Sequence, residues 1–414
     1  MNNFGILYGM ELKKILSKKA VWITLVFGIL FMCVVEMSNM LFDKYDFIDM
    51  TMSGIQYETL QREKGEAVSG EVMNDAFYEK IRTEMNEFKT THEDDIARVI
   101  DTERTGYPGL WYCAERCGYE WLLNTESRAI GYGNSDRYKL FMEGTAEEIV
   151  DAKRDNIILN MEADGLAESE KEYWLERYDR IEKPIKYSYS KGYSTFFDCL
   201  FVIIWLVFML IVIGLSGVFA DENTYKTDAL ILSSRNGRTQ ICLAKLTAGI
   251  TFSVTSMIIV LGICLLVPLM GFGAKGWNAP IQNVIVTSAY DMNIGQAVIM
   301  TFAVAILIAV LCGLFTMLLS HIFRNTVPVM AVQTFVLIIS IFNIPYSFGM
   351  LSQIWALRPT NFLKNFAFIE YRLFPIPGAL INCFQMAGVL YAVFSIVFFV
   401  VTMKLYRNMQ IASR

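Results

Sequence analysis

The sequence predicts an all-α polytopic membrane protein with six transmembrane helices, an N-terminal amphipathic helix and a mainly helical extracytoplasmic domain. The hydrophobic fraction of 54% and the mean hydropathy of +0.38 are higher than soluble domains usually show. Charge is concentrated in residues 43–192, which hold 33 Asp and Glu against 20 Lys and Arg, a net charge of −13. The rest of the chain is apolar and weakly basic, so an acidic soluble module interrupts a membrane protein.

Residues 1–19 are predicted to form a cytoplasmic amphipathic helix. Leu7, Leu12, Ile15 and Leu16 fall near one helical face, and the lysines lie opposite them or at the end. Such a helix suits the inner leaflet, where its basic side chains meet anionic lipid. A frayed basic tail is the alternative interpretation.

Six apolar stretches are each close to the length of about 20 residues that a helix needs to cross a bilayer core of about 30 Å. Backbone groups in hydrocarbon must be satisfied within the segment, so each stretch is expected to be helical. The first is too long for a signal peptide core and lacks a small-residue cleavage site, which favours an uncleaved helix. The predicted spans are 20–41, 196–220, 246–270, 295–320, 327–348 and 386–403.

The positive-inside rule sets the orientation. Twelve lysines and arginines fall in residues 1–19, the 221–245 loop, the turn after the fourth span and the 404–414 tail. Only four fall in the short loops on the other side, namely Lys275, Arg358, Lys364 and Arg372. Both termini are therefore predicted to be cytoplasmic, and residues 42–195 extracytoplasmic.

The outer module shows helical periodicity over 72–100 and 146–181, separated by turn clusters. Its acidic runs, such as residues 93–95, could attract a cation, although a solvated face explains such runs more often. Cys113 and Cys117 share one face of a helix, as two thiols or as a strained disulfide. With only His92 and His321 in the chain, no metal site is predicted.

No catalytic residue is predicted, because the chain lacks a phosphate-binding loop, a nucleophile elbow and a zinc-protease motif. Glu36 is the clearest acid inside a span and marks a possible intramembrane polar site, while Asp198 and Asp291 lie near outer helix ends. Glu36 could instead reach the interface or pair with a base. One acid gives weak support to an ion-coupled secondary transporter, and a membrane sensor or immunity protein without transport is a further alternative.

The loop over 221–245 carries the most specific pattern. It opens with acids, continues through an amphipathic turn at 227–232 and ends with spaced bases. It resembles the coupling region of ABC-2 type (type V) exporter permeases, although Lys226 replaces the usual Gly and the usual Pro before Ser-Arg is missing. The matching residues are Glu222, Thr227, Leu230, Leu232, Arg235, Arg238 and Lys245.

The resemblance implies a permease subunit of an ATP-driven exporter in a bacterial cytoplasmic membrane. A separate ABC ATPase subunit would bind the ATP and Mg, so this chain would bind no cofactor and no nucleic acid. A second permease subunit, identical or a sister chain, would complete the pathway within the membrane lipid. Residues 349–385 resemble the half-inserted outer helices of that family, with an interfacial loop as the alternative. In the ATPase contact, the two leucines would be apolar anchors and the two arginines would pair with acids.

Overall fold

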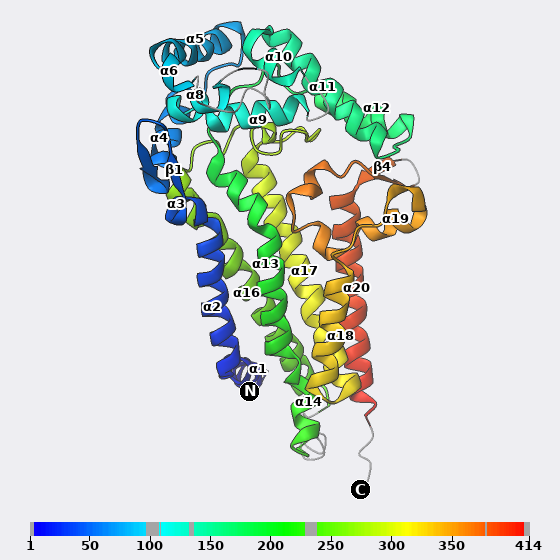
Figure 1. The fold of residues 1–414 in the computed structure, drawn as a ribbon. Coiled ribbons are helices and arrows are strands. Elements are labelled where there is room, and N and C mark those ends of the chain that lie inside the picture. The colour runs from blue at the N-terminus through cyan, green and yellow to red at the C-terminus, as the bar shows by residue number, and fades with distance from the viewer. Residues whose placement is uncertain are drawn as a thin grey trace.

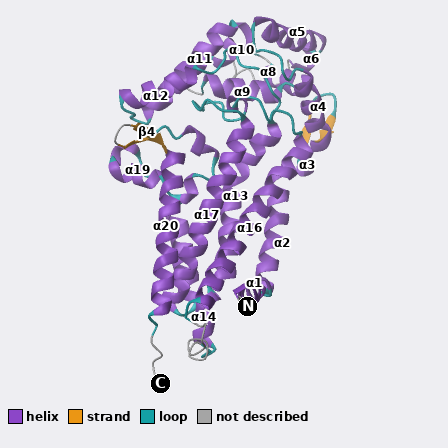
Figure 2. Ribbon diagram, turned by 180° about the vertical axis from the view of Figure 1, so that it is seen from behind, coloured by secondary structure: helices purple, strands orange, loops and turns teal. Residues whose placement is uncertain are grey.

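The computed structural model describes residues 4–96, 107, 109–131, 136–227, 238–376 and 379–409. Long helices form a bundle, a helical module caps one end, and both termini lie at the other end (Figure 1). In the described ranges, the strands form two small hairpins and most residues are helical, as predicted (Figure 2).

Five helices in the described residues are long and apolar enough to cross a membrane. One of them occupies the centre of the bundle, because 72% of its apolar window is buried, against 17% and 22% for the first and last helices. That central helix is α13 (Lys191–Leu215). The other four are α2 (Lys19–Glu36), α16 (Gln240–Phe272), α17 (Ile294–Phe323) and α20 (Cys383–Arg407).

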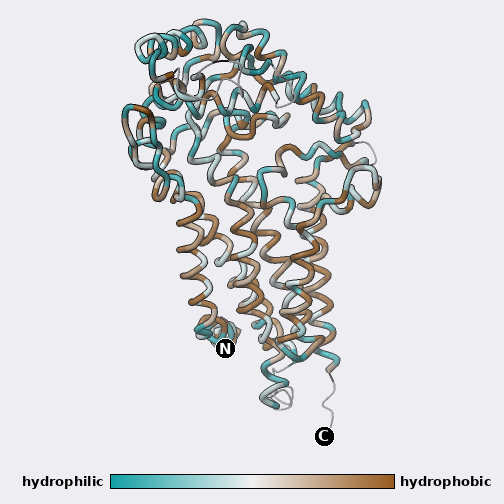
Figure 3. Tube along the Cα trace, in the orientation of Figure 1, coloured by the Kyte–Doolittle hydropathy of each residue, from teal (hydrophilic) through white to brown (hydrophobic). Residues whose placement is uncertain are grey.

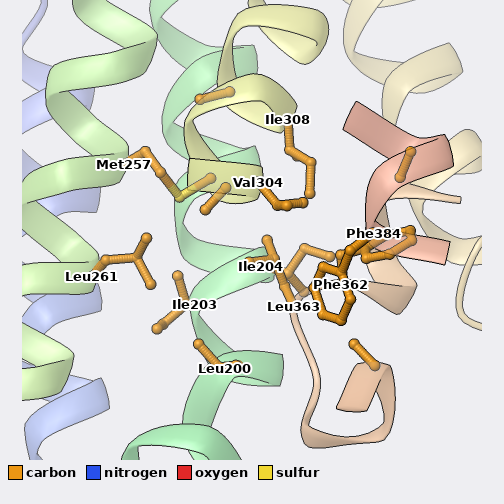
Figure 4. Packing of buried hydrophobic residues seen from close by; sticks show 14 of the residues in the cluster. Leu200, Ile203, Ile204, Met257, Leu261, Val304, Ile308, Phe362, Leu363 and Phe384 are labelled. Carbon is orange, nitrogen blue, oxygen red and sulfur yellow. The ribbon is translucent and has the colours of Figure 1, made fainter. Parts of the chain in front are cut away.

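Side chains from four segments pack around α13 in the middle of the bundle (Figure 4). Leucine and isoleucine side chains of α13 meet α16 on one side, and on the other side meet α17, the 359–363 segment and α20. The labelled residues are Leu200, Ile203, Ile204, Met257, Leu261, Val304, Ile308, Phe362, Leu363 and Phe384.

The outer surface of the bundle is apolar along its length (Figure 3). Phe27, Phe31 and Ile396 are 68%, 63% and 64% exposed, and they belong to the peripheral helices α2 and α20. Soluble proteins rarely expose apolar surface on this scale, because each such side chain costs hydrophobic free energy in water. Lipid tails are the solvent in which this surface is stable.

Short helices extend two of the spans. α2 is followed after Met37 by α3 (Ser38–Phe42), and α13 is followed after Ser216 by α14 (Gly217–Thr224). Together these pairs cover the predicted spans 20–41 and 196–220. The predicted spans 246–270, 295–320 and 386–403 lie within α16, α17 and α20.

The helix that corresponds to the fifth predicted span is shorter than expected. α18 (Thr326–Ile339) has 14 residues, about 21 Å at 1.5 Å per residue, so the predicted range 327–348 is too long. Pro345 cannot continue a helix, and the carbonyl oxygen of the C-cap residue Ser340 accepts hydrogen bonds from Arg358 Nε at 2.7 Å and Thr360 Oγ1 at 2.6 Å. Side chains thereby replace the amide that a continuing helix would supply.

The module over residues 43–190 is helical apart from one hairpin. Its core contains aromatic and aliphatic side chains from several helices, including Phe77, Ile81, Leu123 and Phe141. Its elements are β1 (Lys44–Asp46), β2 (Thr51–Ser53), α4 (Gly54–Ala67), α5 (Asp75–Thr91), α6 (Glu93–Ile96), α8 (Leu110–Cys117), α9 (Glu120–Ile130), α10 (Arg137–Glu143), α11 (Ala146–Ala163) and α12 (Glu168–Asp179).

The charges of the module include exposed and half-buried groups. Glu93 and Asp94 are exposed, which is the solvated face that such runs favour. Burial alone would raise the pKa of Glu84, but hydrogen bonds from Lys64 and from Tyr119 Oη, the latter 2.6 Å long, hold it below its usual value.

Ion pairs and hydrogen bonds join the module to the bundle. Glu58 of α4 is 1% exposed and its Oε2 lies 2.7 Å from Lys191 Nζ at the start of α13. Trp174 of α12 is fully buried and donates from Nε1 to the carbonyl oxygen of Tyr371 at 2.6 Å. The module is therefore packed onto the membrane helices rather than tethered by a linker.

Residues 341–382 connect α18 to α20 through short pieces at the module end (Figure 1). Phe362, Leu363 and Phe368 are buried against the bundle. The remaining elements are η1 (Ile281–Asn283), η2 (Tyr346–Phe348), α19 (Met350–Ala356), η3 (Pro359–Asn361), η4 (Asn365–Ile369), β3 (Leu373–Ile376) and β4 (Ala379–Asn382).

Candidate functional site

The candidate site lies where α14 meets the ends of the other helices, at the end of the molecule that holds both termini (Figure 1). Ser320 Oγ of α17 accepts hydrogen bonds from the amides of Phe219 and Ala220, each 3.1 Å long. At the other end of α14, the Thr227 amide donates to the Glu222 carbonyl oxygen at 2.9 Å. Both ends of this short helix are thereby fixed.

A single buried ammonium group joins α14 to two other helices. Lys245, near the start of α16, is 1% exposed. Its Nζ lies 2.7 Å from Glu222 Oε1 of α14 and 3.0 Å from Glu11 Oε2 of α1 (Phe4–Leu16). It also donates to the carbonyl oxygen of Val218 at 3.0 Å. Three acceptors therefore surround an ammonium group that has three N–H donors.

Helix α1 packs along α16, so it belongs to the junction as well as to the membrane surface. Tyr8 Oη donates to Thr251 Oγ1 at 3.1 Å, and Ile15 is 3% exposed. Ile6 and Met10 are instead 66% and 56% exposed, on a face that α16 does not cover. α1 thus presents one apolar side to protein and another to its surroundings.

The charges around Lys245 balance. Glu11 also lies 2.6 Å from Lys14, and Lys18 lies 3.9 Å from Asp221. Burial alone would raise the pKa of Glu11, but Lys245 and Lys14 lower it below its usual value. Three acids and three bases therefore meet at one place, and we define the charge junction as Glu11, Lys14, Lys18, Asp221, Glu222 and Lys245.

The structure brings together some of the sequence-predicted coupling residues. Glu222 and Lys245 are in contact, and Thr227 closes the helix that carries Glu222. Arg238 is exposed and donates from Nη1 to the Arg407 carbonyl oxygen at 3.4 Å. Leu230, Leu232 and Arg235 lie outside the described residues.

Sequence reasoning missed Glu11, which supplies the second carboxylate of the junction. The signal was present, because Glu11 precedes Ile15 by four residues and so falls on the face that α1 buries. An acid on the buried face of an amphipathic helix needs a buried cation. The lysine that opens the third predicted span was the available partner.

Glu36 lies apart from the charge junction, at the opposite end of α2. It is 4% exposed, and it forms no ion pair with any residue in the described ranges. The alternative interpretation, in which Glu36 pairs with a base, is therefore wrong for the described residues. Cys264 of α16 contacts the carboxyl group, so the site joins α2 to α16.

The residues of the junction hold charges together but contain no nucleophile or metal-binding set. Among the described residues, no group of three or more His, Cys, Asp or Glu side chains could hold a metal ion. The arrangement can transmit a displacement between helices. A movement of α14 would either move α1 and α16 with it or break the buried ion pairs of Lys245.

The fold defines a multi-pass helical membrane protein with a buried charge junction at one end of its helices. Residues 6–371 match the sequence profile described as ABC-2 family transporter protein, and the chain belongs to that family. It is therefore a membrane component of an ABC transporter, which implies an ABC ATPase subunit as its partner. Comparison with curated proteins and with solved structures gave no match.

Proposed function

We propose that this chain is the permease subunit of an ATP-driven exporter in a bacterial cytoplasmic membrane. A separate ATPase subunit docks on the segment over 221–245, and a second permease subunit completes the pathway. The chain itself hydrolyses nothing. The observation that carries this proposal is the Glu222–Lys245–Glu11 contact, because it gives the docking segment a rigid connection to two membrane helices.

The argument is one of force transmission. A ligand or partner shifts a conformational equilibrium only through interactions that differ between the two states. Closure of a nucleotide-bound ATPase can therefore drive this chain only through a contact that moves with the closure. Breaking a buried ion pair costs about 3–5 kcal/mol, so a push on α14 displaces α16 and α1 with it rather than tearing the junction.

The arrangement of charges supports an orientation with both termini in the cytoplasm. Both termini and α14 lie at one end of the bundle (Figure 1). Lys404 and Arg407 are in the last turn of α20, and Arg238 donates to the Arg407 carbonyl oxygen. The acidic module occupies the other end (Figure 3). Basic residues are retained on the cytoplasmic side of membrane proteins, which favours an extracytoplasmic position for the module.

We assign α18 as the fifth of six spans, and the position of both termini at one end of the bundle supports an even number of spans. Val327 and Phe335 are 70% and 64% exposed, as expected of a lipid-facing helix. Gln333 is 1% exposed and donates to Thr316 Oγ1 of α17 at 2.6 Å, which satisfies its amide in the bundle.

The test begins with the tagged full-length chain, purified in mild detergent together with the ABC ATPase encoded beside its gene and reconstituted in liposomes. We expect a stable complex whose ATP hydrolysis exceeds that of the ATPase alone. The double charge reversal R235E/R238E should abolish this stimulation while membrane insertion stays intact. The matched control is K404E/R407E, which makes the same charge change at the same end of the bundle but outside the 221–245 segment.

Retention of full stimulation in R235E/R238E would refute the docking assignment. An equal loss of ATPase stimulation in both double variants would mean that stimulation depends on the total positive charge at this end of the bundle and not on the 221–245 segment. An ion-coupled transporter predicts instead that transport continues without any ATPase and stops in Glu36→Gln. We expect Glu36→Gln to leave ATP-dependent stimulation unchanged, because Glu36 lies at the end of α2 that is farther from the charge junction.

A further inference from the structure

A polar cavity of about 690 Å³ lies between the module and the segment that links α18 to α20. The module contributes Arg128 at the end of α9 and Asn156 and Asn160 of α11. The linking segment contributes Asn343 and Arg358, among others. Residues from both parts line the cavity, and the hydrogen bond from Trp174 of α12 to the Tyr371 carbonyl oxygen holds the two parts together.

Arg358 places a buried positive charge at this cavity without a carboxylate partner. It is 9% exposed and donates to the carbonyl oxygens of Ser340 at 2.7 Å and Trp355 at 2.9 Å, and to Asn343 Oδ1. All three acceptors are neutral, and within the described ranges Arg358 has no ion pair. Burial lowers the pKa of Arg358, and the neighbouring Arg372 lowers it further.

The other two arginines of the cavity differ from each other. Arg372 is neutralised by Glu370, to which its Nε and Nη2 donate at 2.7 and 2.9 Å. Arg128 is half-buried and forms no ion pair with the residues that the structure describes. Asp198 of α13 lies near enough to interact electrostatically with Arg128, and it accepts a hydrogen bond from Asn365 Nδ2 at 2.7 Å.

The lining of the cavity therefore has a positive excess. Three arginines line it against two acids, Glu370 and Asp164, and Glu370 is already engaged. Guanidinium groups bind phosphate through charge-assisted hydrogen bonds that are about twice as strong as neutral ones. A volume near 700 Å³ is typical of small-ligand sites and leaves room beyond a phosphate for a glycerol- or sugar-sized group.

We propose that this cavity binds a phosphate ester, with Arg128 and Arg358 holding the anionic oxygens. Asn160 and Asn156 are placed to hydrogen-bond the polar group attached to the phosphate. The ester is either a soluble molecule or the headgroup of a lipid, since the recognised chemistry is the same. This gives the module a role, because it supplies one of the two arginines.

Equilibrium binding to the purified full-length chain, measured by calorimetry without ATP or any partner, tests the proposal. The probes are glycerol 3-phosphate, dihexanoyl phosphatidylglycerol below its micelle concentration, and the neutral dihexanoylglycerol. We expect saturable binding of a phosphate probe and none of the neutral one. Binding of only the first phosphate probe identifies a soluble ester, binding of only the second identifies a lipid headgroup, and binding of both supports the shared chemistry.

The variant Arg128→Gln should raise the Kd about tenfold, as loss of a hydrogen bond between charged groups does. Its side chain makes no hydrogen bond that the structure records, so the variant is expected to fold. Arg154→Gln is the matched control, because it removes the same charge from the same module outside the cavity. Arg358→Lys, checked for an unchanged melting temperature, should also weaken binding.

Absence of saturable binding by both phosphate probes would overturn the proposal, as would equal weakening by Arg128→Gln and Arg154→Gln. The result is independent of the exporter assignment. Failure of ATPase stimulation in reconstituted complexes would leave a phosphate-ester site intact, and loss of this site would leave ATPase docking untouched.

Discussion

Replacement of Lys245 by methionine removes one charge from the centre of the charge junction and keeps a side chain of similar length. Glu222, whose carboxylate lies 2.7 Å from the ammonium, would then lose its cation, and Glu11, 3.0 Å from the ammonium, would keep only Lys14. Removing one partner of a buried ion pair costs about 3–5 kcal/mol, because the remaining charge is desolvated and unpaired. Lys245→Met should therefore be strongly destabilising.

The assay is thermal unfolding of the purified full-length chain, followed by tryptophan fluorescence. Lys275→Met is the matched control, since Lys275 lies 3.2 Å from Glu66 but its side chain is 57% exposed. Exposed pairs contribute about 0–1 kcal/mol, so the control should unfold close to wild type. The triple variant E11Q/K245M/E222Q should recover part of the loss, because it leaves no unpaired charge.

The pH dependence sharpens this prediction. In the wild type the pKa of Glu11 is lowered, so its contribution to stability is present above about pH 4.5 and is lost as pH falls through the folded-state value. Without Lys245, only Lys14 would oppose the burial that raises the pKa of Glu11, and the buried Glu222 carboxylate would have lost its cation, so ionisation at higher pH would be less favourable in the folded state. The deficit of Lys245→Met should shrink between pH 7 and pH 5. If Lys245→Met and Lys275→Met had the same melting temperature at pH 7, the stabilising role of the charge junction would be refuted.

Three further predictions concern the module and its attachment. Trp174→Phe leaves the Tyr371 carbonyl without its donor and should cost about 1–3 kcal/mol in denaturant unfolding; an unchanged midpoint would contradict docking of α12. Gly192→Ala places a Cβ 2.5 Å from the Gly273 carbonyl oxygen, so α13 and α16 must separate and the melting temperature should fall, whereas an unchanged value would contradict their close approach. Glu84→Gln should flatten the loss of stability between pH 6 and pH 4, because a lowered pKa stabilises above about pH 4.5 and loses that effect on acidification; parallel wild-type and variant profiles would contradict it.

Local pattern in the sequence predicted the long helices well. Apolar runs of bilayer length are a property of contiguous residues, which is why α16, α17 and α20 contain the expected spans. The fifth span was predicted too long partly because a local signal was passed over, since Pro345 cannot continue a helix. The contacts that Arg358 and Thr360 make with the carbonyl oxygen of Ser340 are the non-local part, which no sequence pattern shows.

The coupling segment was predictable only in part. The sequence pattern singled out Glu222 and Lys245, which do form an ion pair, although they stand 23 positions apart in the chain. It did not single out Glu11, whose partner is more than two hundred residues away. Periodicity assigns a residue to a face, whereas only the packing of helices decides which distant side chain meets that face.

The sequence by itself determined that this chain crosses a membrane several times, with one acidic module and one basic end, because hydropathy and charge are additive along the chain. The tertiary structure decided which charges meet. It buried Lys245 between two helices, ended α18 early and joined Arg128 to Arg358 across one cavity. Each of these depends on contacts between residues far apart in the chain, and the low dielectric of the interior makes such contacts strong enough to matter.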